Sequence, residues 1–356
     1  MSRYARPARY PGPARAALAA VSAAILAAAL AACGAPARSP SASGTRPASG
    51  TRPASPGPSA TRGLPASPAS ATRLPATRMV GFSVPGFPPD PAALRGTEAA
   101  TRVHPRVVSW YTSLGAPFNP GYAAEVAKTG ALPVVEIDSD ATPLSTVTSG
   151  SWNSYLAGYA RAVAAYHAPI GIDFDHEFNG DWSPWGPNLN SARTFVKAWR
   201  TIVTIFRKNG AGNVIWIWNP NVDAPNAAPM KPWYPGGKYV TWAGVDGYFF
   251  TPGETFGDVF GATLRELAAV TGKPLIVMET GATPGPWRSV QITGLFAGLR
   301  AARDVIGVVW FDYDKGPGDD WRLEDDKASV AAFRTAALGF ARQSVEAGTG
   351  ATTRSG

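Results

Sequence analysis

The feature that most constrains the fold of this chain is a regular alternation of short apolar runs with amphipathic segments from Met79 onward. Apolar periodicity typical of helices marks Ser191–Lys208, Phe256–Val270 and Ser289–Arg303. Eight strands, mostly alternating with helices, predict an α/β fold of the (β/α)8 TIM-barrel type. The runs that predict strands are Val80–Val84, Val107–Tyr111, Leu132–Ile137, Ile170–Asp175, Val214–Trp218, Val245–Phe250, Leu275–Met278 and Val305–Phe311.

One connection departs from this alternation. Residues 221–238, after the fifth run, are rich in proline, glycine and asparagine, and they predict a long loop rather than a helix. A doubly wound open sheet is the alternative fold. It is disfavoured because no glycine-rich dinucleotide-binding sequence follows the first run.

The net excess of basic over acidic residues lies in the N-terminal segments of the chain. Residues 1–78 hold ten arginines and no acidic residue, which leaves 33 − 10 = 23 basic and 25 acidic residues in the remainder. A domain with a net charge of −2 lacks the basic excess typical of nucleic-acid binding. We therefore expect no nucleic-acid partner.

The N-terminal segment has the pattern of an export signal. An arginine-rich start precedes the alanine-rich run 16–32, which is typical of a signal-peptide core. The run ends in Leu30-Ala31-Ala32-Cys33, which resembles the bacterial lipobox, and Cys33 is the only cysteine of the chain. We expect lipidation of Cys33 and an extracellular protein anchored to the bacterial cell membrane. Ordinary cleavage and secretion, with Cys33 incidental, is the alternative.

The composition divides the chain into four parts. Residues 1–33 are the expected lipoprotein signal peptide, and residues 34–78 form a linker of Ala, Pro, Ser, Thr, Gly and Arg that lacks the apolar residues a core needs. Residues 79–345 are the expected catalytic barrel, and residues 346–356 a disordered tail. We expect the protein to be a monomer.

Two glutamates occur where a barrel places its chemistry. Active sites of such barrels lie at the carboxyl ends of the strands. Glu177 lies two residues after the fourth run, and Glu279 directly follows the seventh. Cleavage of a glycosidic bond needs one carboxylic acid to protonate the leaving oxygen and, in retaining enzymes, one carboxylate to attack the anomeric carbon. The pair therefore predicts a glycoside hydrolase.

Aromatic residues gather at the same strand ends. Sugar rings present flat C–H faces, and indole rings can stack on them while donating a hydrogen bond. Trp216 and Trp218 share one face of their strand and can be core residues instead. The aromatic candidates for sugar contact are Trp110, Trp182, Tyr248 and Trp310.

Residues 176–182, His-Glu-Phe-Asn-Gly-Asp-Trp, resemble the acid/base motif of glycoside hydrolase family 26. Residues 273–281 resemble the nucleophile strand of that family, and residues 213–220 resemble its fifth strand. The resemblance covers roughly residues 79–340 and implies a β-mannanase-like retaining enzyme of clan A. It implies Glu177 as acid/base and Glu279 as nucleophile. The residues expected to contact the polysaccharide are His176, Asn179, Trp182, Tyr248, Trp310, Trp110 and Asp246.

The resemblance gives individual roles and also shows two departures. Tyr248 is expected near the nucleophile, and Trp310 is expected to form the platform under the reacting sugar. Asp173 stands where family members commonly carry arginine, and Phe311 stands where mannan-cleaving members often carry arginine. These departures leave mannan, xylan and β-glucan open as substrates.

Three alternatives remain open from the sequence. Asp173, Asp175 and Glu177 also match the Asp-x-Asp-x-Glu pattern of family 18 chitinases, which use the acetamido group of the substrate as nucleophile. A catalytically inactive glycan-binding lipoprotein would need the same aromatic residues. The acidic cluster could bind a cation such as calcium or magnesium. The chain has only three histidines, which disfavours a histidine-rich metal site, and we expect no metal and no cofactor.

Overall fold

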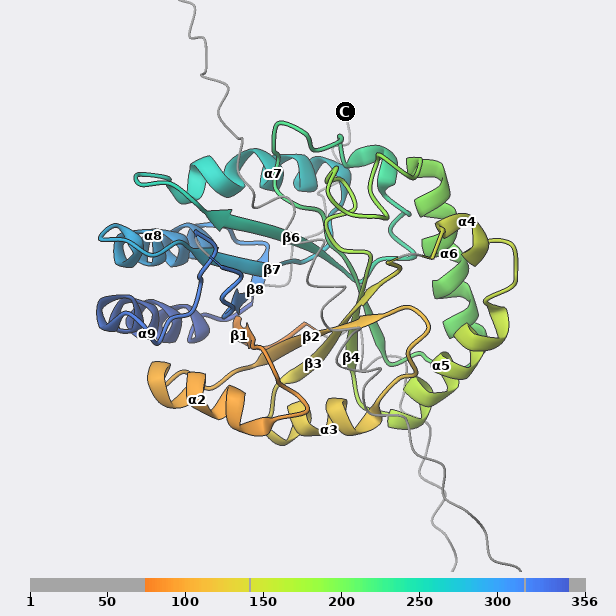
Figure 1. The fold of residues 1–356 in the computed structure, drawn as a ribbon, viewed down its shortest axis with the longest axis horizontal. Coiled ribbons are helices and arrows are strands. Elements are labelled where there is room, and N and C mark those ends of the chain that lie inside the picture. The colour runs from red at the N-terminus through yellow and green to blue at the C-terminus, as the bar shows by residue number, and fades with distance from the viewer. Residues whose placement is uncertain (1–73, 141, 317, 346–356) are drawn as a thin grey trace, which may run out of the picture.

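The computed structural model describes residues 74–140, 142–316 and 318–345, and these form a closed barrel of eight parallel strands in chain order (Figure 1). Closure confirms the predicted (β/α)8 barrel and excludes the open sheet. The strands are β1 Met79–Ser83, β2 Val107–Ser113, β3 Leu132–Asp138, β4 Ile170–Phe174, β5 Val214–Trp218, β6 Trp242–Phe249, β7 Leu275–Ala282 and β8 Val305–Phe311.

Helices surround the barrel (Figure 1). Several of them begin at side-chain caps that the sequence supplies; for example, Ser191 caps α6, and Thr255 with Asp258 forms a capping box at α7. None of the helices in the described ranges has both the length and the apolar character that crossing a membrane requires. The helices are α2 Pro91–Thr101, α3 Pro120–Lys128, α4 Leu144–Val147, α5 Asn153–Tyr166, α6 Ala192–Lys208, α7 Phe256–Val270, α8 Arg288–Ala301 and α9 Lys327–Ala341.

The loop predicted over residues 221–238 is confirmed. It contains only the short 3₁₀ helix η2, Lys231–Trp233, before β6 begins. The backbone of Asn221 also bridges to Asp246 of β6, so the start of this loop is fixed against the barrel wall.

The core consists of two layers separated by the barrel wall. One cluster, which includes Val107, Ile217 and Met278, fills the barrel interior. The other, which includes Trp216 and Trp218, lies between the strands and the helices. Each strand therefore buries both faces, as parallel strands covered by helices do.

The packed domain begins five residues before the expected boundary at Met79. Thr77 forms a β-bridge with Ser344, and the buried Arg78 donates a 2.5 Å hydrogen bond from Nη1 to the carbonyl of Leu299. Residues 74–78 thus belong to the barrel. The expected signal peptide with Cys33, linker residues 34–73 and tail 346–356 lie outside the described residues.

Candidate active site

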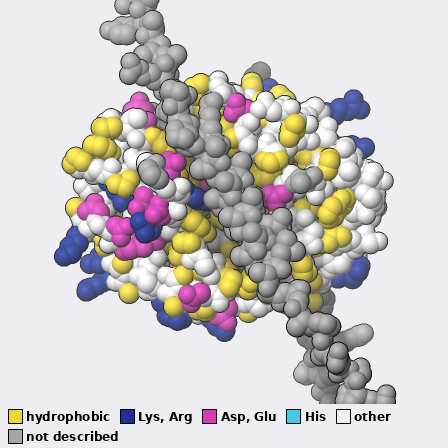
Figure 2. All heavy atoms as spheres, viewed as in Figure 1, with side chains coloured by type: hydrophobic (Ala, Val, Ile, Leu, Met, Phe, Trp, Pro, Cys, Tyr) yellow, Lys and Arg dark blue, Asp and Glu magenta, His cyan; other side chains and the backbone are white. Residues whose placement is uncertain are grey.

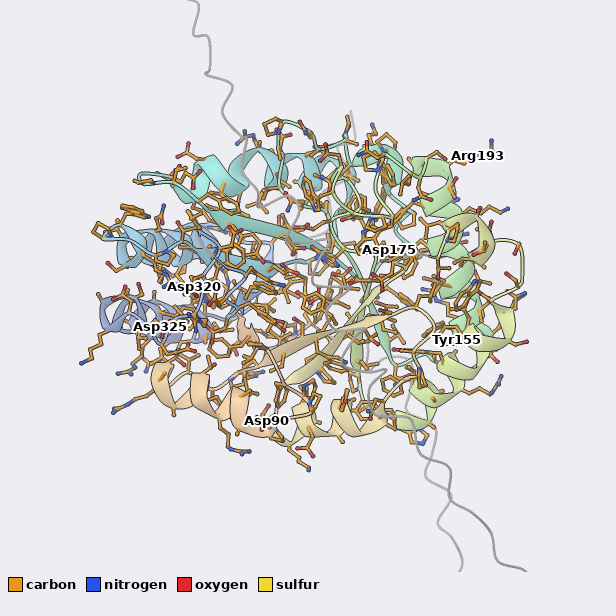
Figure 3. All side chains as sticks on the ribbon, viewed as in Figure 1. Asp90, Tyr155, Asp175, Arg193, Asp320 and Asp325 are labelled. Atoms are coloured by element: carbon orange, nitrogen blue, oxygen red, sulfur yellow. The ribbon has the colours of Figure 1, made fainter. Side chains whose placement is uncertain are left out.

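Two glutamates lie near one another at the carboxyl end of the barrel. Glu177 follows β4 and Glu279 lies in β7, with 2% and 4% of their surfaces exposed. Asp175, which marks this end of β4, lies toward the middle of the ring of helices in Figure 3. The charge of Glu279 contributes to raising the pKa of Glu177, which places the two carboxyls within electrostatic reach of one another.

Glu279 is held by two tyrosines. The hydroxyls of Tyr111 and Tyr248 donate hydrogen bonds to its two different carboxylate oxygens. His176 approaches the same carboxylate, with Nε2 3.9 Å from Oε1. These donors fix the orientation of the Glu279 side chain, and a fixed orientation suits a nucleophile. Tyr111 was missed by the sequence analysis, which selected its neighbour in β2.

Glu177 accepts two side-chain hydrogen bonds. Trp182 Nε1 donates to Oε2 at 2.5 Å, and Asn221 Nδ2 donates to Oε1. Burial and then the charge of Glu279 raise the pKa of Glu177, whereas His176 and the two hydrogen bonds act in the lowering direction. A carboxyl that retains its proton above the usual range is suited to general-acid catalysis.

The turn after β4 sets the direction of the Glu177 side chain. Asp175 and Glu177 have φ values of 54° and 50°, in the left-handed region that side chains other than glycine rarely adopt. The backbone N–H of Glu177 is anchored to the carbonyl of Asn219 at 2.8 Å. The chitinase pattern requires Asp173, Asp175 and Glu177 to lie on one face of a strand. Because β4 ends at Phe174, Glu177 does not lie on that face with Asp173.

Asn179 is linked to Glu177 through Asn221. Its Nδ2 donates to the carbonyl of Asn221 at 3.0 Å, and its Oδ1 accepts from the Asn221 backbone N–H at 2.8 Å. Asn221 in turn holds Glu177. Both polar atoms of the Asn179 amide thus hydrogen-bond to the loop after β5, and contact of Asn179 with substrate stays a prediction. The sequence analysis missed Asn221, since a loop residue carries no periodic signal.

Two glycines allow tryptophans to close on the site. A Cβ atom at Gly180 would lie 2.4 Å from the ring of Trp182, and one at Gly281 would lie 2.5 Å from Trp321. These contacts are far shorter than packed atoms tolerate. Glycine at position 180 therefore lets the Trp182 indole fold back onto Glu177.

His176 is paired with a buried carboxylate. Its Nδ1 lies 3.2 Å from Asp138 Oδ1. Burial opposes the charged form, but Asp138, followed by Glu279 and Glu136, raises the pKa of His176 well above the ordinary value. His176 thus places a positive charge beside Glu279, and its contact with sugar stays a prediction.

Further carboxyls line the barrel below the glutamate pair. Glu136 of β3 and Asp173 of β4 are neighbours in register, and neither carboxyl forms a hydrogen bond with a described residue. Burial raises the pKa of both well above the usual range, so both side chains favour the neutral form. Asp246 is fully buried and accepts from Asn219 Nδ2 at 2.9 Å. The Asp246 carboxyl thus accepts from a neighbouring strand end, and its contact with substrate stays a prediction.

One trio has the composition of a metal site. Within the described ranges, ligand atoms of Glu136, His176 and Glu279 lie within 4.8 Å of one another. The raised pKa of His176 favours a protonated ring, which cannot coordinate a metal. A protonated His176 beside Glu279 therefore fits an ion pair better than a cation site.

Two tryptophans predicted to contact sugar lie in the core instead. Trp310 is 1% exposed, packs 5.4 Å from the ring of Phe333 and donates Nε1 to the carbonyl of Trp321 at 2.8 Å. Trp110 is buried in the same outer layer. Both predictions were wrong because the side chains project from the barrel toward the helices. Trp182 and Tyr248 are partly exposed at the site, as expected.

The residues that follow those tryptophans line the site. Phe311 lies between Tyr111 and Tyr248, with ring centroids 6.2 and 6.0 Å away, and it stacks on Tyr313 at 4.2 Å and 13°. Lys315 Nζ lies 5.0 Å from the centroids of both stacked rings. Of these rings, Tyr111, Tyr248 and Tyr313 are partly exposed, whereas Phe311 is buried.

The sequence model of glycosyl hydrolase family 26 matches residues 110–282 of this chain, a range that includes both glutamates. Endoglucanase H of Acetivibrio thermocellus is 33% identical over 204 residues, which cover 53% of this chain and 22% of that protein. Mannan endo-1,4-beta-mannosidase A of Piromyces sp is 29% identical over 130 residues, covering 34% of this chain and 20% of that protein. The chain thus spans about a fifth of the length of these relatives.

Solved structures share the barrel. A GH26 beta-mannanase from Bacteroides ovatus aligns with a TM-score of 0.58 and 18% identity, over 76% of this chain and 91% of that one. An endo-beta-1,4-mannanase from Cellulomonas fimi aligns with a TM-score of 0.56 and 21% identity, over 73% and 70% of the two chains. At these identities the likeness concerns the fold.

Proposed function

The barrel belongs to glycosyl hydrolase family 26, and from this membership we propose that the protein is a retaining glycoside hydrolase acting on a β-linked polysaccharide. The observation that carries the proposal is the difference between the two glutamates. Glu279 accepts hydrogen bonds from two tyrosine hydroxyls, whereas burial and Glu279 raise the pKa of Glu177. One carboxylate is thus held for attack and one carboxyl retains a proton for the leaving group.

The first step of the reaction forms a glycosyl-enzyme. A Glu279 oxygen bonds to the anomeric carbon as the glycosidic C–O bond breaks, and Glu177 transfers its proton to the departing sugar oxygen. Trp182 and Asn221 then stabilise the Glu177 carboxylate that this transfer leaves. His176 lies beside Glu279 and limits the repulsion between the two carboxylates.

The second step releases the sugar. Glu177 takes a proton from water, and the resulting hydroxide attacks the anomeric carbon from the face that the leaving group vacated. Glu279 leaves as a carboxylate and returns to its two tyrosine partners. Two inversions give net retention, so the first product seen by NMR is expected to be the β-anomer. An α-anomer as first product would overturn the proposed mechanism.

The relatives order the substrates to be tested. The Piromyces relatives are named for mannan, which makes β-mannan the first substrate, and Endoglucanase H makes β-glucan the second. Reducing-sugar release would be measured on mannan, mixed-linkage β-glucan, xylan and chitin. Glu177→Gln is expected to lower turnover by about 10²- to 10⁴-fold, the usual contribution of a general acid.

The same assay separates the alternatives. A chitinase that uses the substrate acetamido group would retain near-normal turnover as Glu279→Gln, whereas the proposed nucleophile cannot be replaced by an amide. An inactive glycan-binding protein would bind polysaccharide but release no sugar from any member of the panel. The donors arranged around both glutamates support an active enzyme, because stacking alone requires neither carboxyl.

We also propose that the protein is exported and that a lipid on Cys33 holds it at the outer face of the bacterial membrane. We further propose that it is a monomer. The support is the sequence Leu30-Ala31-Ala32-Cys33 after an alanine-rich run. Labelling with a radioactive fatty acid is expected to mark the wild type but not Cys33→Ala, and that variant should be found in the medium. Gel filtration of the barrel tests the monomer.

A further inference from the structure

Basic and acidic residues are segregated along the barrel. Residues 182–245 contain seven basic side chains and one acidic side chain, Asp223. The rest of residues 79–356 contains 23 − 7 = 16 basic and 25 − 1 = 24 acidic side chains. The net charges are +6 and −8, so the near-neutral total conceals a strongly cationic segment.

Helix α6 carries most of this positive charge. Its buried face includes Phe195, Trp199 and Ile202, and its polar face has no acidic residue. Like charges three or four residues apart destabilise an isolated helix. This repulsion has no evident structural benefit and would be relieved by a bound anion. The cations of α6 are Arg193, Lys197, Arg200, Arg207 and Lys208.

The cations border a groove on the outer wall of the barrel. The groove has a volume of about 890 Å³ and lies between α6, the start of α5 and the loop around η2. Arg193, Lys197, Arg200 and Lys208 line it. Among the described residues, no ion pair joins Arg193, Lys197 or Lys208 to a carboxylate.

Arg200, which lines the groove, lies beside the aromatic ring of Tyr239. The guanidinium carbons of Arg200 and Arg207 lie 5.4 and 6.0 Å from the Tyr239 ring centroid, and Lys238 Nζ lies 5.0 Å from it. Arg200 Nε also donates to the carbonyl of Pro235 at 2.8 Å. The loop therefore holds the Arg200 side chain in place and brings the further cation Lys238 to the same ring.

The groove is separate from the catalytic centre. In Figure 3, Arg193 lies at the outer end of α6 and its side chain points away from the barrel. The space-filling view shows dark blue basic side chains at the margin where Figure 1 places α6 (Figure 2). From Arg193 to Lys208 the helix extends about 22 Å at 1.5 Å per residue. This length accommodates a segment of a polymer.

We propose that this groove binds a single chain of an acidic polysaccharide through its carboxylates. Arginine and lysine supply donors for carboxylates, and Thr201, Thr204 and Asn153 supply hydroxyl and amide groups for sugar hydroxyls. A membrane surface fits less well, because Leu189 is the one exposed large apolar side chain close in sequence to α6. A single-stranded nucleic acid needs a series of stacking rings, and the groove offers only Tyr234.

The proposal is tested by binding of polygalacturonate to the intact protein carrying Glu177→Gln, which separates binding from hydrolysis. Isothermal titration is expected to show binding that weakens as salt rises, because bound counterions are released. The triple variant R193E/K197E/K208E is expected to raise the Kd by about tenfold or more. In the Glu177 wild-type background, the same three changes should leave hydrolysis of the neutral substrate unchanged.

A matched control keeps the change of charge but moves it elsewhere. R95E/R265E/K327E alters three exposed cations of α2, α7 and α9 and is expected to leave the Kd within about twofold. Equal losses in both triple variants would overturn the groove as the site. So would absence of polygalacturonate binding, or binding only to anionic vesicles or to single-stranded DNA.

Discussion

The hydrogen bond from Trp182 to Glu177 gives the sharpest test of the catalytic assignment. Its indole N–H lies 2.5 Å from Oε2 and stabilises the charged form of the carboxyl. Trp182→Phe removes this donor and keeps an aromatic ring. The pKa of Glu177, already raised by burial and by Glu279, is therefore expected to rise further.

The size of the shift follows from the hydrogen-bond energy. A hydrogen bond to a charged group contributes about 1.5–3 kcal/mol, and one pKa unit corresponds to about 1.36 kcal/mol. Because Trp182 is partly exposed, water replaces part of the lost interaction, and we expect the lower limit of about one unit. Asn221→Ala removes a donor that is buried, so its shift should be larger.

The assay is the pH dependence of kcat/KM on the best neutral substrate. Protonated Glu177 is the active form, so its deprotonation sets the alkaline limb of the profile. Trp182→Phe should move that limb about one unit upward, with a lower maximum. Trp199→Phe is the control, because it removes an indole donor to the carbonyl of Tyr239, remote from the site.

If the alkaline limb of the Trp182→Phe variant stays at the same pH or moves to lower pH, the assignment of Glu177 as the acid is refuted. If the alkaline limb of the Trp199→Phe variant moves upward by the same amount, the effect is due to a general loss of packing. Circular dichroism melts of both variants would show whether the fold is retained at the assay temperature.

Three further changes test the rest of the site. Trp310→Ala should lower the free energy of unfolding by about 3–5 kcal/mol and leave KM unchanged, and a raised KM at unchanged stability would restore its role as sugar platform. Gly180→Ala should lower kcat/KM because its Cβ would lie 2.4 Å from an indole ring, whereas the exposed Gly294→Ala should stabilise α8 by about 0.5–1 kcal/mol in denaturant melts without kinetic effect. Tyr248→Phe removes one donor from Glu279 and should lower kcat/KM roughly 10- to 150-fold, and unchanged kinetics would contradict its role.

The position of the glutamates along the chain was predictable from local pattern. Each follows a run of apolar residues, and the carboxyl ends of all strands in such a barrel meet at one mouth. The order of runs and amphipathic segments thus sufficed to bring Glu177 and Glu279 together. The long loop at 221–238 was predictable for the same reason, since its composition excludes a helix.

The direction of each aromatic side chain was not predictable in this way. Trp110 and Trp310 lie toward the helices, whereas their neighbours Tyr111 and Phe311 line the site. In β2 and β8 both faces are buried, so apolar residues occur at successive positions and the sequence does not show which alternate set faces inward. A shift of one residue exchanges the two faces completely.

The sequence by itself determined the barrel, the positions of Glu177 and Glu279 at its strand ends and the cationic character of α6. The tertiary structure decided which residues reach those glutamates, because Tyr111, Asn221 and Trp182 come from different connections and strands. Register irregularities within β6–β7 and β7–β8 also set the phase of the inward-facing residues near Glu279. Such contacts depend on strand register and on glycines that admit a ring, and neither property belongs to a single local segment.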